Sequence, residues 1–399
     1  MLAAMSPRRP YDFAFLNAGH AYTHFFLLIY PTVVLALERD WEATYAALIG
    51  LAVWGFVAFA LATLPAGWLG DRWSRRGMMT VFFVGIGAAA ILTGLAEGPV
   101  QLAGGLALIG LFAAIYHPVG IAMVADAAPG RLGRALGVNG VFGNLGVALA
   151  ALTAGVLTDA FGWRAAFIAP GAVAVLTGIG WVLLPRRPAV AHGTASRPNL
   201  SLDRATQVRV FVVLVVATLA GGLIFNATTI ALPKVIAERV ALAGSLTGIG
   251  GLVSLVFGFA AVAQIVVGHL IDRVALRTVF VGVVIFQIPL LALAASATGP
   301  TMLAVSLATM LLVFGEIPVH DTIVARCVTP AWRARVYAVK YVLSLGVSAA
   351  VVPLIAWLHA GRGGFEALFW VLAALALAVL FAAIAFPAAV GRVAQPVPA

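Results

Sequence analysis

Long apolar runs, each bounded by short polar or charged stretches, follow one another along nearly the whole chain. Because a helix that crosses a bilayer needs about 20 predominantly apolar residues, these runs predict membrane-spanning helices. Six lie in the first half, at about 13–37, 45–69, 79–96, 100–126, 135–158 and 164–184. Six more lie at about 208–232, 243–270, 278–297, 300–326, 334–358 and 365–386. We number them spans 1 to 12 and predict an all-α membrane protein.

The second half of the chain repeats the first at an offset close to half the chain length. The charged segment at residues 67–76 reads GWLGDRWSRR, and a weaker copy at residues 268–277 reads GHLIDRVALR. Pro118 in span 4 likewise matches Pro318 in span 10. With six spans in each half, both halves have the same orientation, as parallel repeats require. The pattern therefore predicts two parallel six-helix repeats.

A polar segment without a spanning run separates the two sets of spans. It covers residues 185–207 and contains three prolines and four arginines. We predict an N-terminal six-helix bundle over residues 1–184, a cytoplasmic linker over residues 185–207 and a C-terminal six-helix bundle over residues 208–399.

Composition supports a membrane protein and excludes several classes of function. The chain is 63% hydrophobic and only 10% charged, whereas soluble globular domains are about 25% charged. Its formal net charge of +10 comes mainly from arginines in short loops, which orient helices in a membrane, so we expect no nucleic-acid partner. The single cysteine, Cys327, excludes internal disulfides and a thiolate metal site.

The distribution of basic residues predicts the orientation of the spans. If the N-terminus is cytoplasmic, eighteen arginines lie on the inner side and only five basic residues lie on the outer side. Because inner loops carry the excess of Lys and Arg, we expect both termini to lie in the cytoplasm. The membrane is then expected to be a bacterial inner membrane. The inner set is Arg8, Arg9, Arg72, Arg75, Arg76, Arg131, Arg134, Arg186, Arg187, Arg197, Arg204, Arg209, Arg273, Arg277, Arg326, Arg333, Arg335 and Arg392; the outer set is Arg39, Arg164, Lys234, Arg239 and Arg362.

Polar side chains inside the spans concentrate in spans 1, 4, 7 and 10, with additions from spans 5 and 11. Such groups are costly in hydrocarbon and normally face a cavity or a partner helix. Spans 3, 6, 9 and 12 are almost wholly apolar, and Gln287 is their main exception. We therefore predict a substrate cavity lined by Asn17, His20, His24, Tyr116, His117, Asn139, Asn144, Asn226, Thr228, Lys340 and Tyr341.

Three titratable residues of span 10 are candidates for proton coupling: Glu316, His320 and Asp321. Glu316 precedes Arg326 by ten residues, which places it about 15 Å deep in a core about 30 Å thick. Protonation of Glu316 and His320 coupled to substrate binding is one interpretation, and a permanently satisfied hydrogen bond between helices is the other. Asp321 and Lys340 lie at the same predicted depth, so we expect them to pair.

The segment at residues 67–76 resembles the loop between spans 2 and 3 that marks the major facilitator superfamily of secondary transporters, with Ser74 where a glycine is usual. More narrowly, the Tyr116-His117-Pro118 sequence and the span 5 glycines Gly137, Gly140, Gly143 and Gly146 resemble fosmidomycin-resistance-type efflux proteins. The resemblance implies twelve helices in two bundles, alternating access and transport driven by a proton gradient.

The charged loops themselves are predicted to form a cytoplasmic gate. Their charges would pair in one state of the transport cycle and separate in another, although positive-inside topology alone also explains them. The gate set is Gly67, Asp71, Arg72, Arg75, Arg76, Asp272 and Arg273.

Two histidines of span 1 also have the spacing of a metal-binding pair. His20 and His24 lie at i and i+4, and His117 or Glu316 could complete a site at the membrane midplane. No acidic cluster or cysteine joins them, so we expect these side chains to line the cavity. We expect no metal and no cofactor.

A secondary active transporter of a small organic solute is the favoured function, most simply proton-coupled efflux of a drug or an organic anion. Uptake or facilitated permeation of a small metabolite is an alternative, and a membrane substrate sensor is an alternative of another class. An enzyme is not expected, because the chain has no H-E-x-x-H motif, no G-x-S-x-G motif and no phosphate-binding loop. We expect a monomer whose partners are a small-molecule substrate and the lipid bilayer, with protons as the candidate coupling ion.

Overall fold

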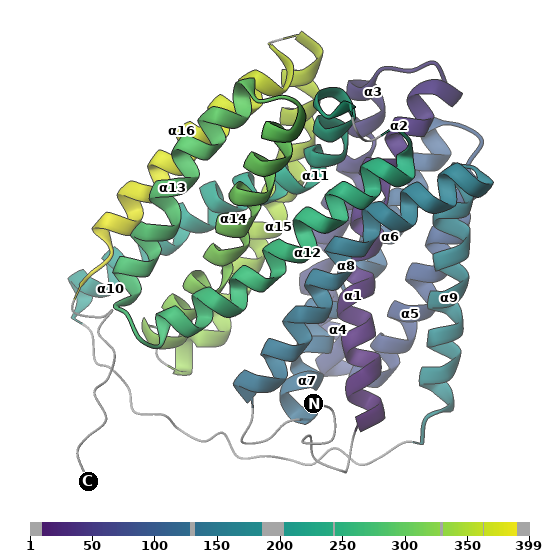
Figure 1. The fold of residues 1–399 in the computed structure, drawn as a ribbon. Helices are drawn as coiled ribbons and strands as arrows, with labels where there is room; N and C mark the ends of the chain where they lie inside the picture. The colour runs from purple at the N-terminus through teal and green to yellow at the C-terminus, as the bar shows by residue number, and fades with distance from the viewer. Residues whose placement is uncertain are drawn as a thin grey trace. The chain divides into compact units, whose positions relative to one another are not determined.

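The computed structural model describes residues 10–127, 132–185, 203–241, 244–327, 330–361 and 363–388. All regular elements in these ranges are helical (Figure 1). Eleven segments of the described chain are long and apolar enough to cross a membrane. The shorter apolar helix Gly346–Gly361 belongs to α15, which occupies the position of span 11. The predicted all-α membrane fold is confirmed.

The helices of the first half follow the predicted spans, but spans 1, 2 and 4 are each divided into shorter elements. The elements are α1 (Pro10–Leu28), α2 (Tyr30–Asp40), α3 (Tyr45–Gly50), α4 (Ala52–Arg72), α5 (Arg75–Gly94), α6 (Pro99–Ala113), the π-helical turn η2 (Tyr116–Gly120), α7 (Ile121–Ala127), α8 (Leu132–Phe161) and α9 (Trp163–Leu183). Span 1 breaks between α1 and α2, where Pro31 occupies the first turn of α2. Proline fits there because its missing N–H has no helical partner in any case.

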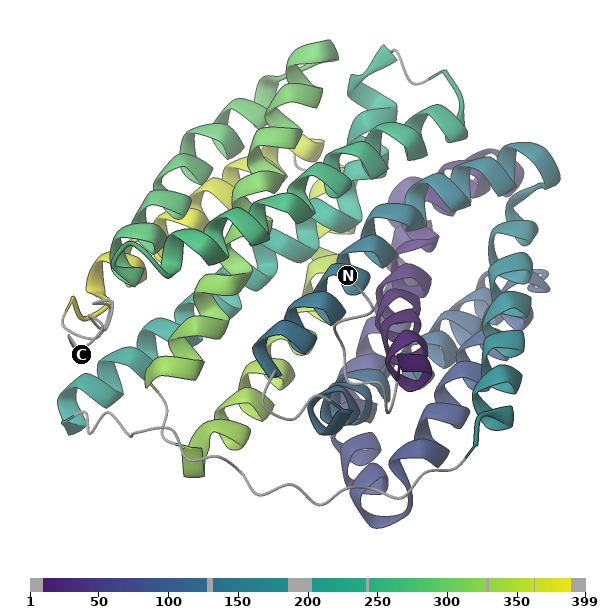
Figure 2. The same cartoon turned by 60° about the horizontal axis from the view of Figure 1, so that its bottom comes forward.

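The second half has a similar series of helices. It consists of α10 (Arg204–Val216), the π-helical turn η3 (Ala217–Gly221), α11 (Gly222–Arg239), α12 (Leu246–Ile271), α13 (Leu276–Ser296), α14 (Gly299–Cys327), α15 (Pro330–Gly361) and α16 (Gly364–Ala385). The yellow α16 runs beside α13 in both views (Figures 1 and 2). In each half, a π-helical turn interrupts one of the polar spans.

The chain forms two compact units, which are described separately here. One unit contains Met1–Thr194 and Ala241–Leu255, and the other contains Ala195–Val240 and Val256–Ala399. Most of the predicted linker, residues 186–202, lies outside the described residues. The division into bundles at residues 1–184 and 208–399 stays a prediction.

Glycines allow the closest helix contacts in the first unit. A Cβ on Gly87 of α5 would lie 2.5 Å from the carbonyl oxygen of Gly171 on α9, and a Cβ on Gly171 would lie 2.7 Å from that of Gly87. Small residues are the usual means of bringing helices together in lipid, where apolar burial provides no driving force between them. This contact joins spans 3 and 6, the two least polar spans of the first half.

Polar side chains close the helix ends at the loops. Ser74 Oγ accepts a hydrogen bond from the Gly77 N–H at the start of α5, 3.0 Å away, so the serine that replaces the usual glycine is an N-cap. Asp203 caps α10 in the same way through the Thr206 N–H. This bond lowers the pKa of the exposed Asp203 carboxyl below its ordinary value.

Candidate functional site

The first unit brings three predicted cavity residues from three different spans into one hydrogen-bond network. Asn139 of α8 donates from Nδ2 to Asn17 Oδ1 on α1 at 3.0 Å. The same amide group lies 2.8 Å from the Tyr116 hydroxyl on η2. All three side chains are buried. This network fixes spans 1, 4 and 5 to one another at the level of the η2 turn.

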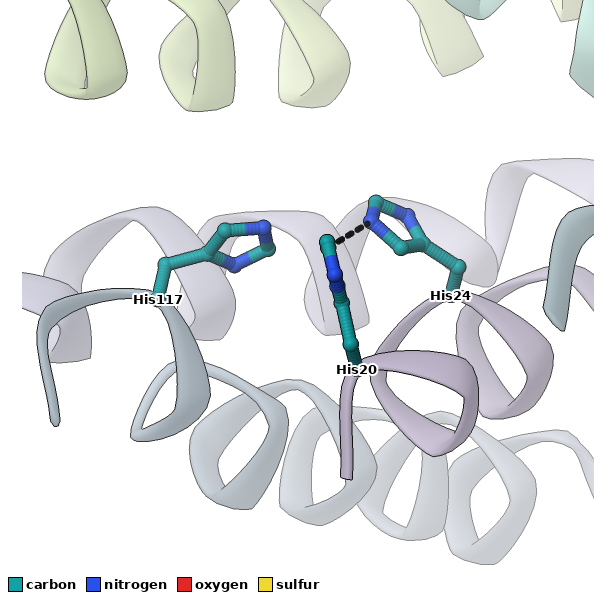
Figure 3. Close-up of side chains that lie close together, drawn as sticks. All are labelled: His20, His24 and His117. Atoms are coloured by element: carbon teal, nitrogen blue, oxygen red, sulfur yellow. Dashed lines mark hydrogen bonds between the residues drawn. The ribbon is translucent and has the colours of Figure 1, made fainter. Parts of the chain in front are cut away.

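The three histidines predicted for the cavity lie beside this network and form a cluster of their own (Figure 3). The ligand-type nitrogens of His20, His24 and His117 all lie within 4.8 Å of one another. His20 Nε2 and His24 Nε2 are 3.3 Å apart. We call these three residues the histidine cluster; each of them is partly exposed.

The orientation of the His20 ring is fixed from several sides. His20 Nδ1 lies 2.8 Å from the carbonyl oxygen of Asn139, and because a carbonyl can only accept, Nδ1 carries the proton. The Tyr116 ring stacks on the imidazole with centroids 5.0 Å apart. A Cβ on Gly143 would lie 2.7 Å from His20 Nε2. His20 Nε2 is therefore an acceptor in this tautomer.

The glycines of span 5 have two distinct roles. A Cβ on Gly146 would lie against the Ala21 carbonyl oxygen of α1, and Gly143 leaves room for His20. Gly137 and Gly140 have no heavy atom within 4 Å of such a Cβ. The first pair permits helix contact, whereas the second pair adjoins open space.

The second unit holds its own polar cluster around Glu316 on α14. Gln287 of α13 donates from Nε2 to Glu316 Oε2 at 2.8 Å, and His320 Nε2 lies 3.0 Å from Glu316 Oε1. All three residues are buried. We call them the carboxylate cluster. It confirms that Glu316 and His320 are neighbours one helical turn apart, as their spacing predicts.

The π-helical turn η3 places a glycine against this carboxylate. A Cβ on Gly221 would lie 2.9 Å from Glu316 Oε1. In the first unit, a Cβ on Gly19 of α1 would lie 2.9 Å from a ring carbon of Tyr116. Tyr116 and Glu316 are equivalent in the repeat, as their neighbours Pro118 and Pro318 are. In each unit a glycine therefore packs against the side chain at this equivalent position. That side chain is the phenol of Tyr116 in the first unit and the carboxyl of Glu316 in the second.

The predicted span 7 residues have mainly local bonds. Asn226 Nδ2 donates to the Gly222 carbonyl oxygen of its own helix, while Asn226 Oδ1 accepts from Ser348 of α15 at 2.9 Å. Thr228 Oγ1 donates to the Ile224 carbonyl oxygen. Thr228 also lines a small cavity of about 20 Å³ between α11, α13, α14 and α16.

Several predicted residues stay without a structural account. Asp321 is exposed, but the side chains of Lys340 and Tyr341 lie outside the described residues, so the predicted Asp321–Lys340 pair stays a prediction. Asn144 is partly exposed on α8.

The predicted gate residues divide into ionic and packing groups. Arg75 donates to Asp71 Oδ1 and to Asp126 Oδ2, each at 2.8 Å, whereas Arg72 is exposed. Arg76 instead donates to the Trp181 and Leu184 carbonyl oxygens, where its positive charge stabilises the C-terminus of α9.

Gly67 has a packing contact, because a Cβ there would lie 3.1 Å from Pro118 Cβ. In the second unit, Asp272 lies 3.6 Å from Arg326. Asp272 lies in the second charged segment and Arg326 lies at the end of span 10, so this pair is equivalent to that of Arg75 and Asp126 in the first half. The acid and the base have exchanged places. Arg273 is exposed.

Gln287 and Asp126 contact predicted site residues but were not themselves predicted for a site, and the same holds for Ser348 and Arg326. Gln287 had a visible signal, because it is the main polar residue in an otherwise apolar span. Asp126 lies at the end of span 4 and had no such signal, since a charged residue at a helix end is ordinary.

Comparison with known proteins gives a family match over more than half of the chain. The sequence model of the Major Facilitator Superfamily matches residues 14–243. Puromycin resistance protein pur8 of Streptomyces alboniger is 30% identical over 213 residues, which are 52% of this chain and 34% of that protein. The match thus spans about a third of the length of pur8.

Two further proteins are similar over more of their length. Multidrug resistance protein MdtG of Escherichia fergusonii is 26% identical over 282 residues, 67% of each chain. The solved structure of a bacterial homolog of the human lysosomal transporter Spinster, inward-facing and occupied, has a TM-score of 0.75 at 16% identity over 96% of both chains. At this identity, the structural likeness concerns the fold alone.

Proposed function

The chain belongs to the major facilitator superfamily, and we propose that it exports a drug or an organic anion by proton-coupled antiport. Membership makes it a multi-pass membrane transporter of small molecules rather than an enzyme. The coupling, the direction of transport and the substrate class are the proposed parts. In this proposal the protein is a monomer in a bacterial inner membrane, with both termini in the cytoplasm.

The observation that carries proton coupling is the carboxylate cluster. Glu316 is 4% exposed, lies on an apolar helix and has one amide donor and one imidazole as polar neighbours. Ionisable side chains inside a membrane span are costly and commonly mark proton or substrate pathways. In this proposal the coupling proton passes between Glu316 and His320, whose side chains are in contact.

Export rather than uptake is supported by the relatives. The two curated relatives described above are named as puromycin and multidrug resistance proteins. The partly exposed imidazoles of the first unit are compatible with a flat organic solute, which such rings contact by stacking.

The test is transport by the full chain in proteoliposomes with radiolabelled puromycin, and with a panel of organic anions if puromycin does not move. We expect accumulation driven by an imposed pH gradient and its collapse when a protonophore is added. Movement that ignores the gradient would instead identify a facilitative permease. Binding without any movement would identify a sensor.

A topology experiment checks the proposed orientation. A fluorescent protein that matures only in the cytoplasm is fused to the C-terminus, and alkaline phosphatase is inserted between Glu97 and Gly98. We expect fluorescence and phosphatase activity together, since the loop between spans 3 and 4 is then outside. Fluorescence without phosphatase activity would contradict the proposed arrangement of the first half.

A further inference from the structure

The histidine cluster has no assigned role in proton coupling, and its three ligand-type nitrogens converge to within 4.8 Å of one another. A tetrahedral ion with Zn–N bonds of about 2.0–2.1 Å holds two ligand nitrogens about 3.3 Å apart. His20 Nε2 and His24 Nε2 are 3.3 Å apart. This spacing matches the edge of a tetrahedral site, and it also allows the hydrogen bond between the two imidazoles.

The protonation of His20 is also correct for a ligand. Its Nδ1–H points to the Asn139 carbonyl oxygen, which leaves the Nε2 lone pair directed at His24. Metal-binding histidines almost always donate their second ring N–H to a carbonyl, a carboxylate or water, and this contact fixes both the tautomer and the ring orientation. The Asn139 carbonyl is therefore placed as an outer partner of a ligand.

The third imidazole can complete the set through a side-chain movement. The three ligand-type nitrogens lie within 4.8 Å of one another, so the farthest pair must approach by about 1.5 Å to reach a tetrahedral edge. The His117 ring makes an edge contact with Phe59, with centroids 5.9 Å apart, and similar contacts with His20 and His24 at 5.5 Å. The proposal requires the His117 ring to move by this distance when an ion binds.

We propose that His20, His24 and His117 bind one divalent transition-metal ion, with zinc, nickel, cobalt and copper as the candidate ions. Three neutral imidazoles suit these ions, whereas magnesium and calcium prefer oxygen ligands. Three protein ligands leave a fourth position for water or for a donor atom of a bound solute. This proposal departs from our sequence-based expectation of cavity lining without a metal, because the structure brings the ligand-type nitrogens of His117 and the span 1 pair within 4.8 Å of one another.

The test uses the full chain with a histidine-free affinity tag, purified in detergent and stripped with a chelator. Cobalt(II) is added and its absorption spectrum is recorded, followed by calorimetric titration with zinc. We expect one ion per chain and the intense visible bands of a tetrahedral cobalt site. A spectrum identical to that of aqueous cobalt would overturn the proposal, and this measurement needs no variant.

Variants then assign the ligands. His24→Ala and His117→Ala should each weaken zinc binding at least about tenfold. His269→Ala is the matched control, because His269 is exposed and bonded to its own helix at the Ile265 carbonyl oxygen. Equal weakening in the control would also overturn the proposal.

Size-exclusion profiles and metal-free melting temperatures show that each variant is folded, and His24→Gln replaces His24→Ala if the alanine variant aggregates. Since the readout is equilibrium binding, its result does not depend on whether the protein is an exporter.

Discussion

The amide of Gln287 donates a hydrogen bond to the carboxylate of Glu316 across the boundary between α13 and α14. Gln287 is completely buried and Glu316 nearly so. A helix that otherwise presents apolar side chains thus contributes one donor to the acid that we propose to couple transport to protons. The partnership ties the apolar span 9 to the chemistry of span 10.

Replacement of this acid separates coupling from transport. In Glu316→Gln the amide can still contact Gln287, but it cannot exchange a proton. We therefore expect transport in proteoliposomes to lose its response to an imposed pH gradient, while exchange of labelled for unlabelled substrate continues. Glu366→Gln, which changes an exposed acid at the start of α16, is the control and should retain the response. An unchanged pH profile in Glu316→Gln would show that another group couples transport.

Removal of the donor should instead affect stability. Gln287→Leu leaves Glu316 Oε2 without its amide partner, and an unsatisfied buried acceptor costs about 1–3 kcal/mol. We expect a lower melting temperature in detergent. In a Glu316→Leu background, Gln287→Leu leaves no buried carboxylate without a hydrogen-bond partner, so it should cost less stability. The double-mutant cycle should therefore show a coupling energy between the two side chains. Equal losses in both backgrounds would mean that the two side chains act independently.

Hydropathy predicts the helices well because the solvent of a membrane protein is apolar over a fixed thickness. The limits of each span follow from the lengths of the apolar runs in the sequence. Which spans line a cavity follows from which of them contain polar residues. The contact of Asn139 with Asn17 and Tyr116 does not follow, since it depends on how three separate helices rotate and pack. The η2 and η3 turns are also invisible in the hydrophobic pattern.

The charged loops show the same limit more sharply. The sequence predicted that Arg75 and Arg76 act together with Asp71, because they are neighbours in the same charged segment. In the structure, adjacent side chains on a helix point in different directions: Arg75 reaches Asp126, whereas Arg76 reaches the end of α9. Sequence adjacency predicted the contact of Arg75 with Asp71 and could not predict the partners outside the segment.

Two glycines of α8 should respond to alanine in opposite directions. At Gly143 a Cβ would lie 2.7 Å from His20 Nε2, whereas Gly140 has open space. Gly143→Ala must displace the imidazole, and overpacking of this kind costs about 1–3 kcal/mol. Gly140→Ala only lowers the conformational entropy of the unfolded chain, and this stabilises the folded protein by about 0.4–1 kcal/mol. Melting temperatures in detergent should therefore fall for the first and rise for the second, and shifts of the same sign would contradict the contact with His20.

Asp71 should matter for the rate of transport more than for stability. Its side chain is 71% exposed and that of its partner Arg75 is 39% exposed, and ion pairs in water contribute at most about 1 kcal/mol. If the pair belongs to a gate, Asp71→Asn changes the balance between conformations and slows transport several-fold. It should leave the pH response intact, in contrast to Glu316→Gln.

Asp203→Asn is the matched control for this prediction, because asparagine also caps helices well and the exposed Asp203 lies outside the charged loops. Initial rates at several pH values measure both properties. A lower melting temperature with an unchanged rate would assign Asp71 to topology and folding alone. Loss of the pH response in Asp71→Asn would place coupling, rather than gating, in the first half.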